Sequence, residues 1–100
     1  DLSEQFVTIA RDYSQVKYPD FKKFVRNSIE YSFLQGESIW ATKGDYSRAV
    51  PECSGCALGS EDATPKCKSF LELSEKARLQ WKLEGDLASF EKEIRQTAVH

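Results

Sequence analysis

Apolar residues recur at helical spacing in three stretches of this chain, and these stretches set the expected architecture. The spacing predicts amphipathic helices over residues 1–15, 19–34 and 69–96. The stripe positions are, in chain order, Leu2, Phe6, Ile9 and Tyr13; Phe21, Phe24, Val25, Ser28, Ile29 and Ser32; and Leu79, Leu83, Leu87, Phe90 and Ile94. No stretch alternates apolar and polar residues as a half-buried strand does, so the sequence predicts an all-α chain.

Local signals agree with the predicted helix starts. Asp1 and Glu4 fit a capping box at the first helix, and Pro19 suits the first turn of the second. Ser69 and Glu72 fit another capping box, at the start of the last helix. All three helix starts are therefore indicated both by apolar spacing and by the residue types found there.

The segment between the second and third helices carries different signals. Gly36 is placed to end the second helix, and residues 37–42 are expected to add a short helical turn carrying Trp40. Residues 43–66 hold three of the five glycines and two of the three prolines without any period, so we expect a loop there. Gly85 interrupts the last helix at a cost of about 1 kcal/mol relative to Ala, which does not overturn so regular a pattern.

Four aromatic side chains lie away from the three stripes. Tyr18, Phe33 and Trp40 fall outside them, and Trp81 flanks the last one. Apolar surface in this amount exceeds what one three-helix core needs and is typical of an interface. Packing of these side chains onto the loop is the alternative interpretation.

Charge and composition narrow the expected partners. With a net charge of −2 and 14 dispersed basic residues, the chain has no electrostatic footprint for nucleic acid. No apolar run approaches the roughly 20 residues that span a bilayer, so we expect no membrane partner. The chain contains no Met and opens without signal-peptide features, which we interpret as the mark of a processed, secreted chain.

The three cysteines, Cys53, Cys56 and Cys67, lie in one polar stretch. Such clustering is typical of disulfides in secreted domains, with one thiol left free or paired to another chain. The sequence leaves the pairing open. A redox site lacks its βαβ context, and a zinc site would need the terminal His100 as its fourth ligand, so both are weaker interpretations.

The remaining polar residues predict no active site in this chain. Glu84, Asp86, Glu91 and Glu93 interleave with basic residues and are expected to form a solvated helix face. His100, the only histidine, is the last residue and poorly placed to act as a general base. With no phosphate loop and no nucleophile elbow, we expect no catalytic, substrate-binding or metal-binding residue here.

A run near the end of the second predicted helix resembles the adenosine deaminase family. The run Asn-Ser-Ile-Glu-Tyr-Ser-Phe-Leu contains Asn27, Ser28, Tyr31, Ser32 and Leu34. It is similar to a run near the C-terminus of these enzymes, and most closely to that of the secreted adenosine deaminase-related growth factors.

Two further segments extend the resemblance. Residues 1–6 look like the helix that follows the last barrel strand in that branch of the family. Ser-Glu-Lys at 74–76, followed by Trp81 and Phe90, resembles its closing helix. The three segments occur in the family's order, and together with the sequence around them they cover about two-thirds of the chain.

The resemblance implies a zinc-dependent (β/α)₈ TIM barrel. Its zinc activates a water that replaces the 6-amino group of adenosine or AMP, which releases ammonia and gives inosine or IMP. The motifs that hold the metal are absent from residues 1–100. The resemblance therefore implies that a larger N-terminal chain holds the zinc, and that this chain is a structural, proteolytically separated part of the enzyme.

In this interpretation the chain divides into three parts of one larger catalytic domain. Residues 1–35 are barrel-end helices, residues 36–68 are a cysteine-bearing insertion, and residues 69–100 are the closing helix. A homo-oligomer of the assembled enzyme is compatible with this interpretation. The alternative is a self-contained, secreted, disulfide-linked helical interaction module, in which all three stripes meet in one core.

Overall fold

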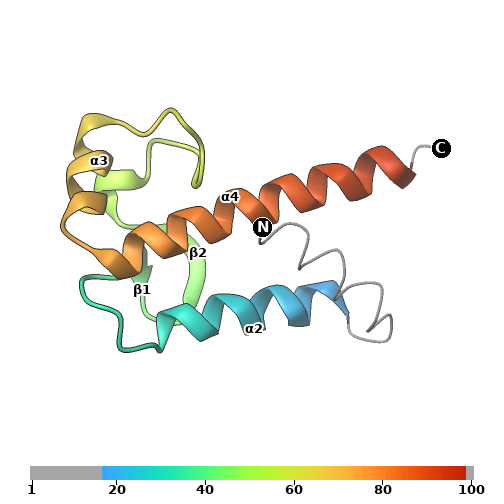
Figure 1. Ribbon diagram of the computed structural model, residues 1–100, viewed down its shortest axis with the longest axis horizontal. Coiled ribbons are helices and arrows are strands. Elements are labelled where there is room, and N and C mark those ends of the chain that lie inside the picture. The colour runs from blue at the N-terminus through green and yellow to red at the C-terminus, as the bar shows by residue number, and fades with distance from the viewer. Residues whose placement is uncertain (1–16, 99–100) are drawn as a thin grey trace.

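The protein's computed structural model describes the backbone of residues 17–98, most of it helical. The elements, in chain order, are α2 (Tyr18–Glu30), β1 (Trp40–Thr42), β2 (Asp45–Ala49), the short 3₁₀ helix η1 (Pro51–Cys53), α3 (Pro65–Glu72) and α4 (Glu75–Ala98). Figure 1 shows α2 beside α4, with the sheet and α3 gathered toward the start of α4. The expected helical character is confirmed for this part of the chain, but an all-α fold is wrong because two strands pair. The helix predicted over residues 1–15 lies outside the described residues.

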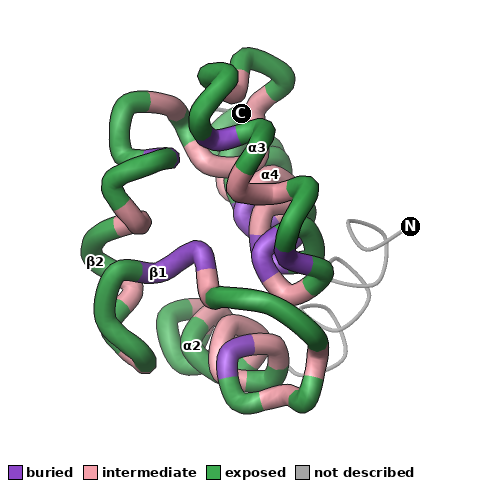
Figure 2. The backbone as a smooth tube through the Cα atoms, turned by 90° about the vertical axis from the view of Figure 1, so that its left-hand side faces the viewer, coloured by how far each residue is buried: buried purple, intermediate pink, exposed green. Residues whose placement is uncertain are grey.

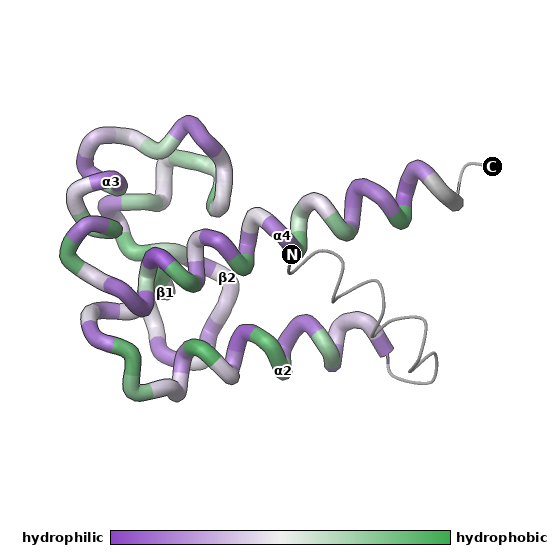
Figure 3. The backbone as a smooth tube through the Cα atoms, viewed as in Figure 1, coloured by the Kyte–Doolittle hydropathy of each residue, from purple (hydrophilic) through white to green (hydrophobic). Residues whose placement is uncertain are grey.

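The two long helices pack through one apolar strip. Its members are Tyr18, Phe21, Val25 and Ile29 from α2 and Leu83, Leu87 and Phe90 from α4. Four predicted stripe positions, Phe24, Ser28, Leu79 and Ile94, are exposed instead. The buried strip is narrower than predicted because, within the described residues, each helix faces a single long neighbour rather than two. Figure 3 shows the alternation of hydrophobic and hydrophilic positions along both helices.

α2 ends at Glu30, earlier than the predicted boundary at residue 34. The Ser32 hydroxyl donates to the Ile29 carbonyl at 2.6 Å, which satisfies a carbonyl of the last turn and lets the chain turn away. Gly36 does not end the helix; it lies in the loop beyond, with φ +106°. A Cβ there would lie 2.3 Å from Ser74 Oγ, so glycine allows this loop to approach the start of α4.

Residues 40–49 form a β-hairpin where the sequence analysis expected a helical turn followed by loop. β1 and β2 are antiparallel, with Trp40 opposite Ala49 and Thr42 opposite Asp45. Gly44 has φ +79°, which suits the tight turn between the strands. The prediction was wrong because the strands are short and bury only Trp40. No alternating pattern therefore shows in the sequence.

The last predicted helix is two helices. The Ser74 hydroxyl accepts a hydrogen bond from the Ala77 amide at 3.0 Å and donates one to the Glu37 carbonyl at 2.6 Å, so it caps α4 while tying it to a distant loop. The start of α3 is capped by Thr64, whose hydroxyl accepts from the Cys67 amide at 3.3 Å. The capping box predicted at Ser69 is therefore wrong, because that residue lies inside α3.

A second apolar cluster lies beside the first, under the hairpin. Its buried members are Ile39, Trp40 and Ala77, and Tyr46, Leu58, Phe70, Leu71 and Trp81 pack around them. Figure 2 shows the buried positions on β1, α3 and the facing side of α4. Most of the aromatic residues expected at an interface, Tyr18, Trp40 and Trp81, are thus used in the two clusters, whereas Phe33 is fully exposed.

A disulfide between Cys53 and Cys67 ties η1 to α3, and both cysteines are fully buried. Gly85 has a packing role in the same region, since a Cβ there would lie 2.9 Å from the Gly59 carbonyl oxygen. Gly85 thus lets the loop that carries Cys56 pack directly on the backbone of α4. The cystine and this contact stabilise the segment over residues 43–66 that was predicted to be a loop.

Removing the disulfide is expected to destabilise the protein. Replacing both Cys53 and Cys67 with Ala releases a loop closed over 14 residues, and we expect the free energy of unfolding to fall by about 3 kcal/mol. Urea unfolding followed by circular dichroism measures this change. Cys56→Ala is the matched control, because Cys56 forms no disulfide. A loss as large in the control as in the double variant would contradict the assignment.

Candidate functional site

The run that resembles the deaminase family forms the last turns of α2 and the exit from it. Asn27 Oδ1 accepts a hydrogen bond from the Tyr46 hydroxyl, which links the helix to β2. The Ser28 hydroxyl donates back to the Phe24 carbonyl, at 2.9 Å. Tyr31 is largely exposed, and the Ser32 hydroxyl accepts from the Leu34 amide at 3.4 Å. The polar members of this run thus bond to their own helix end and to the hairpin.

The second resembling segment, Ser-Glu-Lys at 74–76, docks directly onto this helix end. Lys76 Nζ donates to the carbonyl oxygens of Glu30 at 3.0 Å and Ser32 at 3.1 Å. The Lys76 amide donates to the Gln35 carbonyl at 2.9 Å. A lysine ammonium here satisfies carbonyls that the end of α2 leaves without helical partners and complements the negative end of the helix dipole. The two segments therefore form one contact, although some forty residues separate them in the sequence.

A buried carboxylate lies at the centre of this contact. Glu30 is 1% exposed and accepts hydrogen bonds from the Gly44 amide and from Gln80 Nε2, both at 3.0 Å. Gln80 Oε1 in turn accepts from the Ile39 amide at 2.8 Å. The sequence analysis missed both buried side chains. A signal existed for Gln80, because it falls at helical spacing between the buried Ala77 and Leu83.

The acidic residues of α4 do not all form the solvated face that was predicted. Arg26 makes two hydrogen bonds to the Glu84 carboxylate, from Nε at 3.0 Å and Nη2 at 2.7 Å, and Glu84 is only 8% exposed. The Arg26 guanidinium also lies 5.3 Å from the Trp40 ring and 5.5 Å from the Tyr46 ring. Glu84 was misassigned because its partner lies 58 residues away in the sequence.

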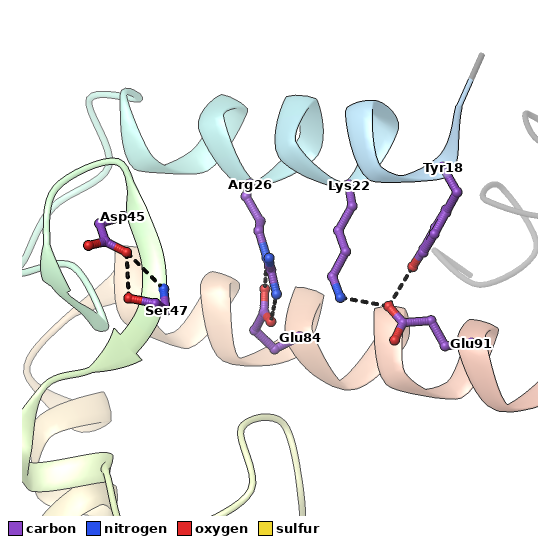
Figure 4. A network of polar contacts seen from close by, with 7 residues as sticks. All are labelled: Tyr18, Lys22, Arg26, Asp45, Ser47, Glu84 and Glu91. Carbon is purple, nitrogen blue, oxygen red and sulfur yellow. Dashed lines mark hydrogen bonds and ion pairs between the residues drawn. The ribbon is translucent and has the colours of Figure 1, made fainter.

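A second polar contact joins the start of α2 to the later part of α4. Lys22 Nζ lies 2.8 Å from Glu91 Oε2, and the Tyr18 hydroxyl donates to the same oxygen at 2.7 Å. Figure 4 shows both contacts between the helices, with Asp45 and Ser47 bonded to each other on the hairpin nearby.

These contacts also determine the ionisation of two of the groups. Burial opposes ionisation of Glu91, but the hydrogen bonds from Lys22 and Tyr18 outweigh it and hold the pKa of this carboxyl below its usual value. Burial, followed by the hydrogen bond to Glu91, raises the pKa of Tyr18 above its usual range. Glu91 is therefore held in its charged form and Tyr18 in its neutral form.

The cysteines are arranged for structure rather than for metal binding. Cys53 and Cys67 are joined, and the half-buried Cys56 bonds weakly through Sγ to the Cys53 carbonyl at 3.4 Å. No group of three or more possible ligands occurs within the described part of the chain. The weaker zinc interpretation loses two of its four ligands to the disulfide, and its fourth, His100, lies outside the described residues.

A cavity of about 560 Å³ opens beside the docked segments. It lies between the end of α2, the loop before β1 together with the hairpin, the start of η1, α3 and the start of α4. Trp40, Val50 and Phe70 supply its apolar lining, and five charged residues complete it: Glu30, Glu37, Lys43, Glu52 and Lys76. Sequence analysis did not predict this cavity, because its walls come from five segments that meet only in the folded chain.

Breaking the Arg26–Glu84 pair is expected to cost much more than breaking the outer pair. Arg26→Met leaves the buried Glu84 carboxylate without its cation, so we expect the free energy of unfolding to fall by about 3 kcal/mol. Lys22→Met removes a more exposed ion pair and should cost less than about 1 kcal/mol. Urea unfolding of both variants tests this order, and equal losses would contradict it.

The charge on Glu91 is expected to make stability depend on pH. Since its pKa is lower in the folded chain than the usual 4.5, its contribution is present above that value and is lost as the pH falls through the folded pKa. Glu91→Gln should therefore be less stable than the unchanged protein at neutral pH, and the difference should shrink as the pH falls below 4.5. Denaturant unfolding across this range measures it, with the exposed Glu61→Gln as control. A difference that did not change with pH would rule out this role for the charge.

Two remaining properties of the chain are the membrane-spanning potential of its helices and its similarity to known proteins. Among the described residues, no helix is both long and apolar enough to cross a membrane. Comparison of the chain with protein-family models, with curated proteins and with solved structures returns no match.

Proposed function

We propose that this chain is the C-terminal, structural portion of a zinc-dependent purine deaminase that removes the 6-amino group of adenosine or AMP. The resemblance over residues 27–34 and 74–76 is the starting point. The observation that carries the proposal is that these two segments contact each other in the fold, through Lys76 and the carbonyls of Glu30 and Ser32. Segments that belong to one ancestral structure are expected to stay packed together when sequence is inserted between them.

The geometry of residues 36–68 supports their assignment as an insertion. The Lys76 amide, eight residues after the proposed insertion ends, donates to the carbonyl of Gln35, the residue just before it begins, at 2.9 Å. Because the two ends meet, the intervening segment can be lengthened without displacing α2 from α4. The Cys53–Cys67 disulfide then stabilises the inserted segment internally.

The surface of the described residues supports a role in a larger assembly. Phe24, Tyr31, Phe33 and Leu73 are all more than half exposed. Large apolar side chains left in solvent are typical of surfaces that another part of a protein covers. The proposed partner is the larger N-terminal chain of the same enzyme, which would hold the zinc. The disulfide favours a secreted enzyme.

Native mass spectrometry of the protein as purified from its source, with zinc measured in the same sample, tests this proposal. We expect the 11.4 kDa chain in a complex with a much larger chain and about one zinc per complex. The complex should release ammonia from adenosine or AMP, and guanosine serves as the control substrate. A stably folded, metal-free 11.4 kDa particle that releases no ammonia would overturn the proposal and leave the secreted interaction module.

A matched pair of variants separates structure from catalysis in the same enzyme. Lys76→Met removes the ammonium that joins the two resembling segments, so it should lower the unfolding temperature while leaving KM for the purine unchanged. Lys66→Met, at an exposed position of α3, should change neither quantity. A raised KM in Lys76→Met with normal stability would contradict a purely structural role for this chain.

A further inference from the structure

The three cysteines of the chain lie close together in the fold. The Cys53–Cys67 disulfide joins η1 to α3, and Cys56 follows in the turn after η1 with a free thiol. Both members of the disulfide are fully buried, whereas Cys56 is half-buried. A reagent dissolved in the surrounding water therefore reaches the Cys56 thiol more easily than it reaches the disulfide.

The turn after η1 brings Cys56 back beside Cys53. The amide and the thiol of Cys56 both donate to the Cys53 carbonyl, each at 3.4 Å. A turn closed in this way keeps its first and fourth Cα atoms within about 7 Å of each other, and disulfides join Cα atoms that are about 4.4–6.8 Å apart. The backbone therefore allows Cys53 to pair with Cys56 instead of with Cys67.

The loop that carries Cys56 is anchored by contacts other than the disulfide. Leu58 packs against the apolar cluster under the hairpin. Gly59 lies directly against α4, since a Cβ at Gly85 would lie 2.9 Å from the Gly59 carbonyl oxygen. These contacts keep Cys56 near Cys53 even when the bond to Cys67 breaks. A nucleophile that is held beside its target reacts as if it were present at high concentration.

Cys67 lies where a departing thiolate is stabilised. It is the third residue of α3, and its amide donates to the hydroxyl of the capping residue Thr64 at 3.3 Å. The positive end of a helix dipole stabilises negative charge, and a thiol whose thiolate is stabilised leaves a disulfide faster. Cys53, by contrast, is the last residue of the short η1. Attack on the Cys53 sulfur, with Cys67 as the leaving group, is therefore the favoured direction.

We propose that the Cys53–Cys67 disulfide is exchangeable and that Cys56 is the residue that releases it. The Cys56 thiolate attacks Sγ of Cys53, and the Cys53–Cys56 bond forms as the Cys53–Cys67 bond breaks. The electron pair of the broken bond leaves on Cys67, which takes up the proton that Cys56 gave up. One disulfide and one thiol exist before and after the step, so it needs no outside oxidant or reductant.

The exchange changes what the disulfide holds together. In its first position it ties η1 to α3, and in its second it only bridges the turn after η1. The insertion is then free to separate from α3, and the new disulfide includes the more accessible Cys56. The proposal is thus a redox-sensitive connection within the insertion, and it does not depend on the deaminase assignment.

Reduction of the folded protein by dithiothreitol tests this proposal. The reagent gives two electrons and two protons to the protein and closes into its own cyclic disulfide. In Cys56→Ala it has to reach the buried bond directly, so we expect loss of the Cys53–Cys67 bond to be at least about tenfold slower than in the unchanged chain. Ala57→Ser, at the exposed neighbouring position, is the matched control and should leave the rate unchanged. Equal rates in the unchanged chain and Cys56→Ala would overturn the proposal.

Incubation of the unchanged chain without reductant identifies the sulfur that is attacked. The sample is kept in mildly alkaline buffer, checked by circular dichroism to be folded, quenched with acid, alkylated and mapped by mass spectrometry. We expect molecules with a Cys53–Cys56 disulfide and an alkylated Cys67 to accumulate, and none in a sample that is quenched at once. An unchanged Cys53–Cys67 disulfide throughout, or a link between Cys56 and Cys67, would overturn the proposal.

Discussion

The burial of one carboxylate at the end of α2 is the constraint on which the rest of this fold depends. Glu30 is removed from water and bonded to the hairpin through Gly44 and to α4 through Gln80. A buried polar group is tolerated only when its hydrogen bonds are made, so the hairpin and α4 have to lie where they do. Lys76, on α4, stabilises the same contact because its ammonium group donates a hydrogen bond to the Glu30 carbonyl at the end of α2. Three segments that are distant in the sequence are thereby fixed at one place.

Regular periodicity made part of this fold predictable. The existence of α2 and of the long final helix followed from apolar spacing over many residues, and the clustered cysteines correctly indicated a disulfide. The split between α3 and α4 was not predictable, because the role of Ser74 depends on the Glu37 carbonyl, 37 residues away in the sequence. Glu84 was assigned to a solvated surface for the same kind of reason, since only the fold brings Arg26 to it. Local patterns predict elements, whereas long-range polar pairs decide where the elements end and which polar residues are buried.

The candidate sites differ in how far the sequence reveals them. The resembling run at residues 27–34 is continuous and could be found without a structure, but its contact with residues 74–76 is a property of the fold alone. The cavity is less accessible to sequence reasoning, because Glu37, Glu52 and Phe70 come from three separate segments. Each of these residues, taken alone, is an ordinary loop or helix residue.

α4 takes part in both apolar clusters: Ala77 belongs to the one under the hairpin, and Leu83, Leu87 and Phe90 belong to the one against α2. A single helix shared in this way couples the two clusters mechanically. Fraying of its first turns would uncover the hairpin cluster and release the bonds at Glu30 together, so the hairpin cluster cannot open independently of the Glu30 contact. Beyond Glu91 the helix continues with Ile94 about half exposed, and amide hydrogens there are expected to exchange without disturbing either cluster. One continuous helix is therefore expected to have a long cooperative part and a shorter last part that opens locally.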